Sequence, residues 1–373
     1  MKDSESVNAA QATSTGTTVL VTGGAGFIGC ALSHKLAADA DRWVVLDSLH
    51  PQVHTGVGRP ADLHEAAELV VGDVTDAAVW DAVLASASPD VVIHLAAETG
   101  TAQSLNEATR HAKANVVGTT ELTDAFGRSG LLPRRIILSS SRAVYGEGTW
   151  RRSNGALFRP GQRSHTQLEA AQWDFPDAVS IPSTAAATVP TPTSVYGATK
   201  LAQENILSAW GSSRGVEITT LRLQNVYGPG QSLINPYTGI VSLFSQLARA
   251  SKSIPLYEDG QITRDFVFIE DIADAFVAAL ALDGAKANGT FDIGSGTGTT
   301  IARLAEIIAE FYGSPAPAVN GAFRDGDVRH AAVDIADSLN ALAWSPRWTV
   351  EAGVGTLQEW IATELDRAES TRG

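Results

Sequence analysis

The feature that most constrains the fold lies near the N-terminus, where a short apolar strand leads directly into a glycine loop. Residues 17–22 read TTVLVT, and residues 23–29 read GGAGFIG. Glycines allow a tight turn and a close approach of the backbone to a pyrophosphate, whose charge is met by amide groups at the N-terminus of the following helix. The order of strand, loop and helix predicts a dinucleotide site, to which we assign Gly23, Gly26, Phe27, Ile28 and Gly29.

A second predicted strand, residues 43–47, ends in Asp47, which lies 47 − 29 = 18 residues beyond the last glycine of the loop. A carboxylate at this place can accept hydrogen bonds from both ribose hydroxyls of NAD, and it repels the 2′-phosphate of NADP. NAD is therefore the expected cofactor. Asp73 is placed near the adenine, although a helix N-cap is an equally good interpretation. The remaining predicted cofactor residues are Val74, Leu95, Ala96, Ala97 and Asn115.

Tyr196 and Lys200 lie four residues apart at the start of a predicted helix, so their side chains share one helical face. A lysine beside a tyrosine favours the phenolate. The phenolate can then take a proton from an alcohol at a pH well below the free tyrosine pKa of about 10. Ser141 ends an apolar strand, RIILSSS, at the sheet edge where open α/β sheets bind ligands. We therefore predict Ser141, Tyr196 and Lys200 as catalytic residues, with Tyr196 and Lys200 also contacting NAD.

Apolar strands alternate with helical stretches between residues 17 and 150, a pattern typical of βαβ units and a parallel sheet. The predicted fold is α/β, with a Rossmann-type doubly wound parallel sheet and a smaller C-terminal α/β substrate-binding lobe. Residues 17–200 are assigned to the NAD-binding domain. Residues 201–364 are assigned mostly to the lobe, with some segments returning to the Rossmann domain. One long helix is expected at 104–126.

Three other segments depart from this pattern. Periodicity fails between Ser141 and Tyr196, where residues 147–192 are rich in proline and arginine, and we predict an insertion or a partly ordered lid. Residues 1–16 are polar and read as a disordered leader without a secretory signal. Residues 365–373 read as a charged tail, after helices at 334–344 and 350–364 that are expected to close the lobe.

Composition narrows the possible partners. The formal net charge of −14 argues against nucleic acid, whose phosphates need clustered lysine and arginine. No apolar stretch approaches the roughly 18 residues of a membrane span, so no membrane partner is expected. The single cysteine, Cys30, cannot form an internal disulfide or a cysteine metal cluster, and no metal is expected. The absence of a predicted membrane span and of a secretory signal predicts a cytoplasmic protein.

Three motifs taken together resemble the extended short-chain dehydrogenase/reductase family of nucleotide-sugar epimerases and dehydratases. They are TGGAGFIG at 22–29, SSSRAVYG at 139–146 and YGATK at 196–200. The resemblance implies a nucleotide-diphosphate sugar as substrate and a homodimer as the assembly. It also implies that the substrate is contacted by Ser141, Asn225, Arg264, Arg324 and Asp327. The charge and hydrogen-bonding capacity of these side chains suit a diphosphate and a sugar.

Two further details narrow the chemistry that the resemblance implies. Dehydratases of this family carry Asp-Glu directly after the active-site Thr or Ser, whereas this chain has Arg142 and Ala143 there, which disfavours water elimination. Segments such as 51–56, 100–104 and 230–239 resemble a subgroup of dTDP-L-rhamnose 4-epimerases. The expected activity is therefore an NAD-dependent 4-epimerase, an isomerase, acting on dTDP-L-rhamnose through a 4-keto intermediate. A UDP-hexose 4-epimerase, a nucleotide-4-ketosugar reductase and a non-catalytic NAD-sensing protein stay open as alternatives.

Overall fold

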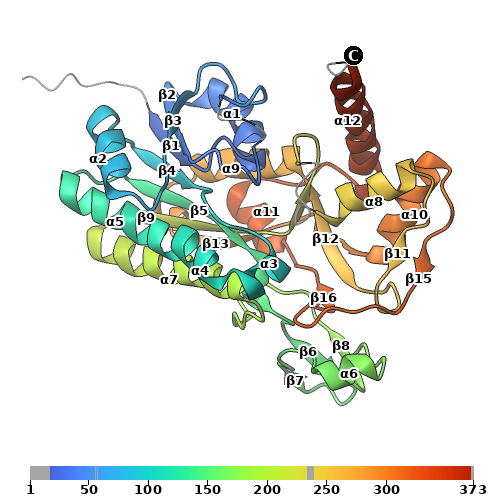
Figure 1. Ribbon diagram of the computed structural model, residues 1–373. Coiled ribbons are helices and arrows are strands. Elements are labelled where there is room, and N and C mark those ends of the chain that lie inside the picture. Colours follow the sequence, from blue (N-terminus) through green and yellow to red (C-terminus); the bar gives the residue numbers. More distant parts are fainter. Residues whose placement is uncertain (1–16, 55, 57, 233–238, 371–373) are drawn as a thin grey trace, which may run out of the picture.

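The computed structural model describes residues 17–54, 56, 58–232 and 239–370, and its element order is shown in Figure 1. The predicted leader at 1–16 lies outside the described residues, as do part of the segment 230–239 and the last residues of the predicted tail. The described part of that tail, residues 365–370, continues the final helix. Within the described ranges, none of the helices is both long and apolar enough to cross a membrane.

A large sheet of seven parallel strands forms the centre of the molecule, which confirms the predicted Rossmann-type α/β class. Across the sheet the strands run in the order β13 (Gly289–Ile293), β9 (Glu217–Leu223), β5 (Arg135–Ser141), β4 (Val91–His94), β1 (Thr18–Thr22), β2 (Arg42–Asp47) and β3 (Glu68–Val71). The chain leaves β1 first to one side and later to the other. The strand order therefore reverses beside β1, where open sheets of this kind bind dinucleotides.

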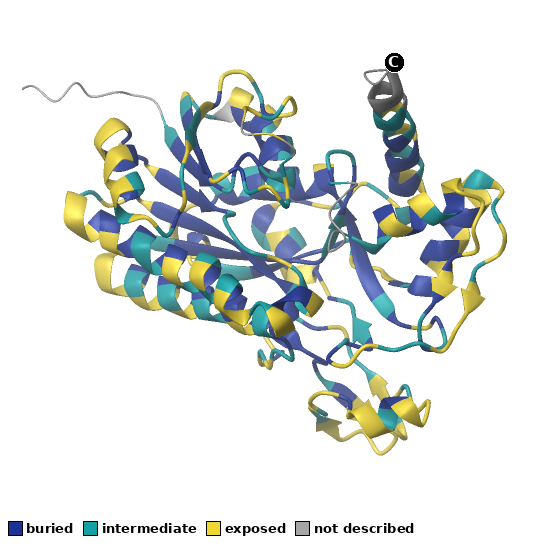
Figure 2. Ribbon diagram, viewed as in Figure 1, coloured by how far each residue is buried: buried dark blue, intermediate teal, exposed yellow. Residues whose placement is uncertain are grey.

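Helices cover both faces of this sheet, as Figure 1 shows. One face carries α2 (Ala77–Ser86), α5 (Gly118–Ser129) and α7 (Val195–Arg214), and the other carries α1 (Phe27–Asp39), α9 (Ile269–Leu280) and α11 (Ala336–Leu342). Successive strand residues point to opposite faces. In β1, Leu20 packs in the core with Trp80 and Leu122, whereas Val19 and Val21 pack in the core with Leu32 and Phe276. The central strands are accordingly buried along most of their length, whereas the edge strand β3 is partly exposed (Figure 2).

A smaller lobe lies beside the carboxyl ends of the large sheet. Its sheet contains β10 (Asn225–Tyr227), β12 (Thr263–Phe268), β14 (Gly298–Thr300) and β16 (His330–Ala331), with a separate pair formed by β11 (Pro255–Leu256) and β15 (Ala318–Val319). Helices α8 (Ile240–Arg249), α10 (Ile301–Tyr312) and α12 (Val350–Ser370) pack around a second core, which includes Phe244, Phe268, Leu304 and Leu357.

The segment 147–192 forms a small unit of its own that projects from the body (Figure 1). It contains a three-stranded antiparallel sheet of β6 (Trp150–Arg152), β7 (Leu157–Phe158) and β8 (Ala178–Ser180), together with α6 (His165–Glu169). Trp150 is 1% exposed and makes an edge-to-face contact with Phe175, the ring centroids being 4.9 Å apart. A local aromatic core thus orders a segment whose sequence shows no periodicity.

The structure differs from the sequence predictions in two helical regions. The single helix expected at 104–126 is divided into α3 (Thr101–Asn106), α4 (Ala108–His111), a π-helical segment η1 (Ala112–Val117) and α5. The division occurs at Glu107, whose ψ of 41° leaves the helical range. The helix within 334–344, expected to close the lobe, instead contacts β13 and α9 and places Leu342 and Trp344 in the core of the large sheet.

Candidate active site

The glycine loop follows β1 at the centre of the sheet. Gly23 has a φ of +67°, and a Cβ there would lie 2.6 Å from the backbone nitrogen of Ala96, so a side chain would collide with the loop after β4. Gly26 is the N-cap of α1, and Phe27, Ile28 and Gly29 form its first turn. Among the described residues no side chain caps this helix. Its first amide groups therefore face the mouth of the loop, as the pyrophosphate prediction requires.

Asp47 closes the loop from β2. Its Oδ2 accepts a hydrogen bond from the Ala25 amide at 3.0 Å, and its Oδ1 accepts one from the Leu49 amide at 2.9 Å. The His54 Nε2 atom lies 3.8 Å from the same Oδ1. These contacts hold the carboxylate at the end of β2, beside the loop that it was predicted to serve.

Two predicted cofactor residues have well-defined structural contacts. Asp73 is exposed and accepts a hydrogen bond from the Thr75 amide at 2.8 Å, whereas Asp76 is the N-cap of α2, so the N-cap interpretation of Asp73 is wrong. Asn115 is buried in the π-helical segment. Its Oδ1 accepts from the Glu98 amide at 2.8 Å, and its Nδ2 donates to Glu98 O at 3.0 Å and to Thr199 Oγ1 at 2.9 Å. Asn115 thus joins the loop after β4 to helix α7.

These residues fit NAD. An uncapped helix N-terminus faces the position of a pyrophosphate, and a fixed carboxylate stands at the end of the next strand. The buried Val74 and the half-buried Leu95, Ala96 and Ala97 line the carboxyl ends of β3 and β4, where the predicted site extends. Tyr196 and Lys200 lie in the first two turns of α7.

Ser141 and Tyr196 come together because α7 packs closely on the turn after β5. That turn is the 3-10 segment η2 (Arg142–Tyr145). A Cβ on Gly197 would lie 2.4 Å from the carbonyl oxygen of Ala143, so glycine allows this approach. The Ser104 Oγ accepts a hydrogen bond from the Tyr196 amide at 3.0 Å and fixes the start of the helix.

The hydrogen bonding of Ser141 orients its hydroxyl proton. Its Oγ accepts a hydrogen bond from the Ala143 amide at 3.2 Å, which leaves its proton free to be donated. A hydrogen bond with Ser141 lowers the pKa of Tyr196, as expected where a donor favours the phenolate. The predicted serine and tyrosine therefore lie within hydrogen-bonding reach of each other.

The charges around Tyr196 differ from the sequence prediction. Burial raises the pKa of Tyr196, while the Ser141 hydrogen bond and the positive charge of Arg142 oppose that rise. Lys200 is 2% exposed, and burial lowers the pKa of its ammonium to about 7, against the opposing charge of Glu204. Arg142 is thus a cation that lowers the pKa of Tyr196, while burial holds the pKa of Lys200 near neutral.

Three of the predicted substrate residues face this centre. Arg142 Nε donates to Asn225 Oδ1 at 3.0 Å, and Arg264 Nη2 donates to Asp327 Oδ1 at 2.7 Å. Arg264 is 5% exposed, and its charge acts on Arg142 together with that of Asp327. Arg324 lies apart from this group, because it is exposed and its guanidinium stacks over the Tyr257 ring at 5.0 Å.

A buried chain of polar side chains, absent from the sequence predictions, supports the catalytic helix. Tyr145 donates to Asp292 Oδ1 at 2.7 Å, and Arg222 donates to the Tyr145 oxygen at 3.0 Å and to Glu204 Oε2 at 2.6 Å. Glu204 lies one turn beyond Lys200 on α7. Its spacing of four residues was the signal in the sequence that could have predicted its place beside Lys200. The other members come from distant segments and could not be connected without the fold.

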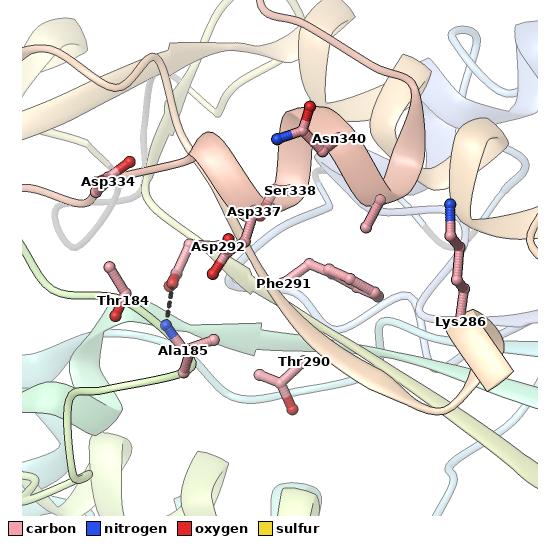
Figure 3. Close-up of a pocket in the computed structure, with 12 residues that line it drawn as sticks. Thr184, Ala185, Lys286, Thr290, Phe291, Asp292, Asp334, Asp337, Ser338 and Asn340 are labelled. Carbon is pink, nitrogen blue, oxygen red and sulfur yellow. Dashed lines mark hydrogen bonds between the residues drawn. The ribbon is translucent and has the colours of Figure 1, made fainter.

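The Asp292 end of this hydrogen-bonded network reaches an open pocket of about 580 Å³ beside β13 (Figure 3), whose lining does not include Tyr196. Asp292 points into the pocket wall, where its Oδ2 accepts a hydrogen bond from the Ala185 amide at 2.6 Å. The pocket is lined by residues from the end of the insertion, β13 and α11. It is therefore distinct from the space between Ser141 and Asn225.

A parallel doubly wound sheet with a glycine loop and a Ser, Tyr and Lys group at its carboxyl edge defines a dinucleotide-dependent enzyme of the Rossmann type. The family model described as the NAD dependent epimerase/dehydratase family matches residues 19–294. The chain belongs to this family, and its expected cofactor, NAD, agrees with the family description.

Relatives of known activity match nearly the whole chain. It is 62% identical over 352 residues to the dTDP-L-rhamnose 4-epimerase of Burkholderia thailandensis, covering 94% of this chain and 97% of that protein. It is 31% identical to the UDP-glucose 4-epimerase of Mycolicibacterium smegmatis, covering 92% and 97%. Among solved structures, the UDP-glucose 4-epimerase of Thermotoga maritima with UDP-glucose has a TM-score of 0.77 at 27% identity, covering 94% of this chain and 100% of that one. The Thermus thermophilus UDP-glucose 4-epimerase complex with NAD has a TM-score of 0.73 at 26% identity, covering 93% and 99%.

Proposed function

We propose that this protein is an NAD-dependent nucleotide-sugar 4-epimerase that interconverts dTDP-L-rhamnose and dTDP-6-deoxy-L-talose through a 4-keto intermediate. The observation that carries the substrate is the 62% identity to a dTDP-L-rhamnose 4-epimerase over 94% of the chain. The reaction type is supported independently by the juxtaposition of Ser141, Tyr196 and Lys200 at the carboxyl edge of the sheet.

The proposed roles follow from the contacts of each side chain. Tyr196 takes the proton of the sugar 4-hydroxyl, and Ser141 donates a hydrogen bond to the shared oxygen site. Lys200 holds the nicotinamide ribose. NAD, held by the glycine loop, Asp47 and Lys200, would supply reversible hydride transfer at the sugar C4 atom, out from one face and back to the other. Because no net oxidation occurs, neither Tyr196 nor Ser141 needs an external proton source over a full cycle.

The substrate residues are proposed to hold the nucleotide while the sugar turns over. Arg264 and Asn225 lie close to the catalytic centre and can bind a diphosphate or the adjoining sugar hydroxyls. Arg324 is exposed on the lobe over the Tyr257 ring, and its proposed contact with the nucleotide is made from the solvent side. Asp327 is already paired with Arg264, so we assign it the orientation of that arginine.

The test is incubation of the purified protein, with only trace NAD, with dTDP-L-rhamnose and separately with UDP-glucose. Proton NMR of the products should show the C4 epimer of rhamnose accumulating to an equilibrium mixture. Conversion of UDP-glucose alone would support the UDP-hexose 4-epimerase alternative, which the 31% identical relative favours. Stoichiometric consumption of added reduced cofactor would instead identify a ketoreductase, and NAD binding without any turnover would identify a sensing protein.

We also propose a cytoplasmic homodimer. The assembly is supported by the family resemblance and by the exposed apolar side chain of Val117, 42% exposed, directly before α5. Ile206 of α7 is also partly exposed, whereas Leu207 is buried in the core and Trp210 packs on Phe126. Light scattering at the monomer mass would contradict the dimer, and cell fractionation tests the location.

A further inference from the structure

Arg142 differs from the other buried arginines in its partners. Arg222, Arg264 and Arg329 each bond a carboxylate, at 2.6, 2.7 and 2.7 Å. Arg142 is partly buried, and its one hydrogen bond among the described residues goes from Nε to the neutral amide of Asn225. A guanidinium taken from water without an anion is costly, so its retention points to an anion that forms or binds during function.

The anions near Arg142 are already committed to other cations. Asp327 pairs with Arg264 at 2.7 Å, and Glu147 lies 3.3 Å from Arg163 and accepts hydrogen bonds from the Arg329 amide. Burial and the charge of Arg264 lower the pKa of Arg142 to about 9, so it remains a cation at neutral pH.

The remaining neighbour that can carry a negative charge is the Tyr196 phenol. Arg142 directly follows Ser141, whose hydroxyl bonds Tyr196, and its turn packs against the first turn of α7 through the Gly197 contact. The opposite charges of Arg142 and Tyr196 each favour the charged form of the other, so that each opposes the effect of burial on the other's pKa. Lys200, on the same helix, titrates near neutral pH and supplies less charge.

We propose that Arg142 is a positioning residue that serves as the counter-charge of the Tyr196 phenolate, held in place by Asn225. The inference rests on the proposed role of Tyr196 as the base. It also assigns Asn225 a second task, because its amide oxygen aims the guanidinium. In this arrangement the proton leaves Tyr196 to solvent before the substrate binds, and the phenolate then takes the proton of the sugar hydroxyl.

The experiment is an ultraviolet difference titration of one phenol in the NAD-bound protein. For each variant, the spectrum of the same variant carrying Tyr196→Phe is subtracted, so that only Tyr196 is observed. Arg142→Gln should raise the apparent pKa of Tyr196 by about one unit or more, which is at least a tenfold lower phenolate fraction below that pKa. Arg142→Lys should titrate between the wild type and Arg142→Gln.

Two further variants keep the result interpretable. Asn225→Asp places a carboxylate on Arg142, neutralises it locally and should shift Tyr196 in the same direction without removing the arginine. Arg214→Gln removes an equal charge from the exposed far end of α7, 214 − 196 = 18 residues or roughly 27 Å away, and should leave the titration unchanged.

Several outcomes would overturn the proposal. An unchanged pKa of Tyr196 in Arg142→Gln would do so. An equal shift of that pKa in Arg214→Gln would also do so, as would a pKa in Arg142→Lys no closer to wild type than in Arg142→Gln. If Arg142→Gln lowered the affinity for dTDP by more than about tenfold and left the pKa of Tyr196 unchanged, Arg142 would be assigned to the diphosphate instead. Because the titration needs no substrate, failure to convert dTDP-L-rhamnose would refute the proposed function and leave this inference standing.

Discussion

Two groups of buried charges lie close together in this protein and differ in how they are paired. Where the insertion meets the lobe, Arg163 and Arg329 both bond Glu258, at 2.9 and 3.0 Å. In the catalytic centre, no carboxylate lies within 4 Å of Arg142 or Lys200 among the described residues. The paired charges of the first group hold the insertion to the lobe, whereas Arg142 and Lys200, unlike Arg264, stay available for groups that change charge during a reaction.

The largest expected effect separates the two regions by activity. Tyr196→Phe removes only the phenolic oxygen of the unpaired centre, so turnover of dTDP-L-rhamnose should fall by about 10²–10⁴-fold or more, with NAD still bound. Tyr312→Phe is the matched control, because that hydroxyl bonds Gln358 on the lobe and should be dispensable for turnover. Substantial residual activity in Tyr196→Phe would argue against the assigned base.

The second effect concerns stability. Arg163→Met leaves the buried Glu147 and Glu258 without one partner each, and breaking such a pair costs about 3–5 kcal/mol of unfolding free energy. Urea unfolding monitored by circular dichroism would measure the loss. A variant as stable as the wild type would mean that this joint is not structural, and the contrast between the two regions would fail.

A third, smaller effect has the opposite sign. Burial lowers the pKa of Lys200 to about 7, so below that pH the folded protein holds a buried ammonium at an energetic cost. The unfolded chain also holds the proton at this pH, but its ammonium is in water and carries no such cost. Between pH 7 and about 10 only the unfolded chain keeps the proton, and stability should rise with pH. Lys200→Met, freed of NAD, should be more stable than wild type by about 1 kcal/mol or more at pH 6, with the gain disappearing towards pH 10. A gain independent of pH would show packing as its cause.

The smallest effect is expected at the surface. Arg303 bonds Glu351 at 3.3 Å, but the two side chains are 47% and 53% exposed. Arg303→Met should therefore change the unfolding free energy by no more than about 1 kcal/mol. A loss as large as that of Arg163→Met would show that pairing alone, without burial, sets the strength of these contacts.

The parts of the fold that could be predicted from the sequence are those whose signals lie within a single helix or strand. The strand at 135–141 was predicted with the bounds that the structure has, since its apolar run and its end signal lie within it. The break at Glu107 was not predicted, because a change of hydrogen-bond register leaves the apolar spacing almost intact. The small sheet of the insertion depends on Trp150 meeting Phe175, a contact that alternation does not reveal.

The candidate site divides in the same way. Ser141, Tyr196 and Lys200 belong to short motifs whose residue types state their chemistry, so they could be named from the sequence. The environment of Arg142 could not be predicted. Asn225, Arg264 and Asp327 follow it by 83, 122 and 185 residues in the sequence, and only the packing of the lobe brings them near it. Burial, which decides the charge state of Lys200, is likewise a property of the assembled structure.

The position of β13 has a consequence for biosynthesis. This strand completes the edge of the large sheet beside β9, yet it comes from residues 289–293, after three strands of the smaller lobe have been made. Trp344, later still, packs in the same core. A nascent chain can therefore assemble its first strands on the ribosome, but the β9 edge stays open to mispairing until nearly the whole polypeptide has emerged. Chaperone demand and sensitivity to C-terminal truncation should both concentrate on this late-arriving strand.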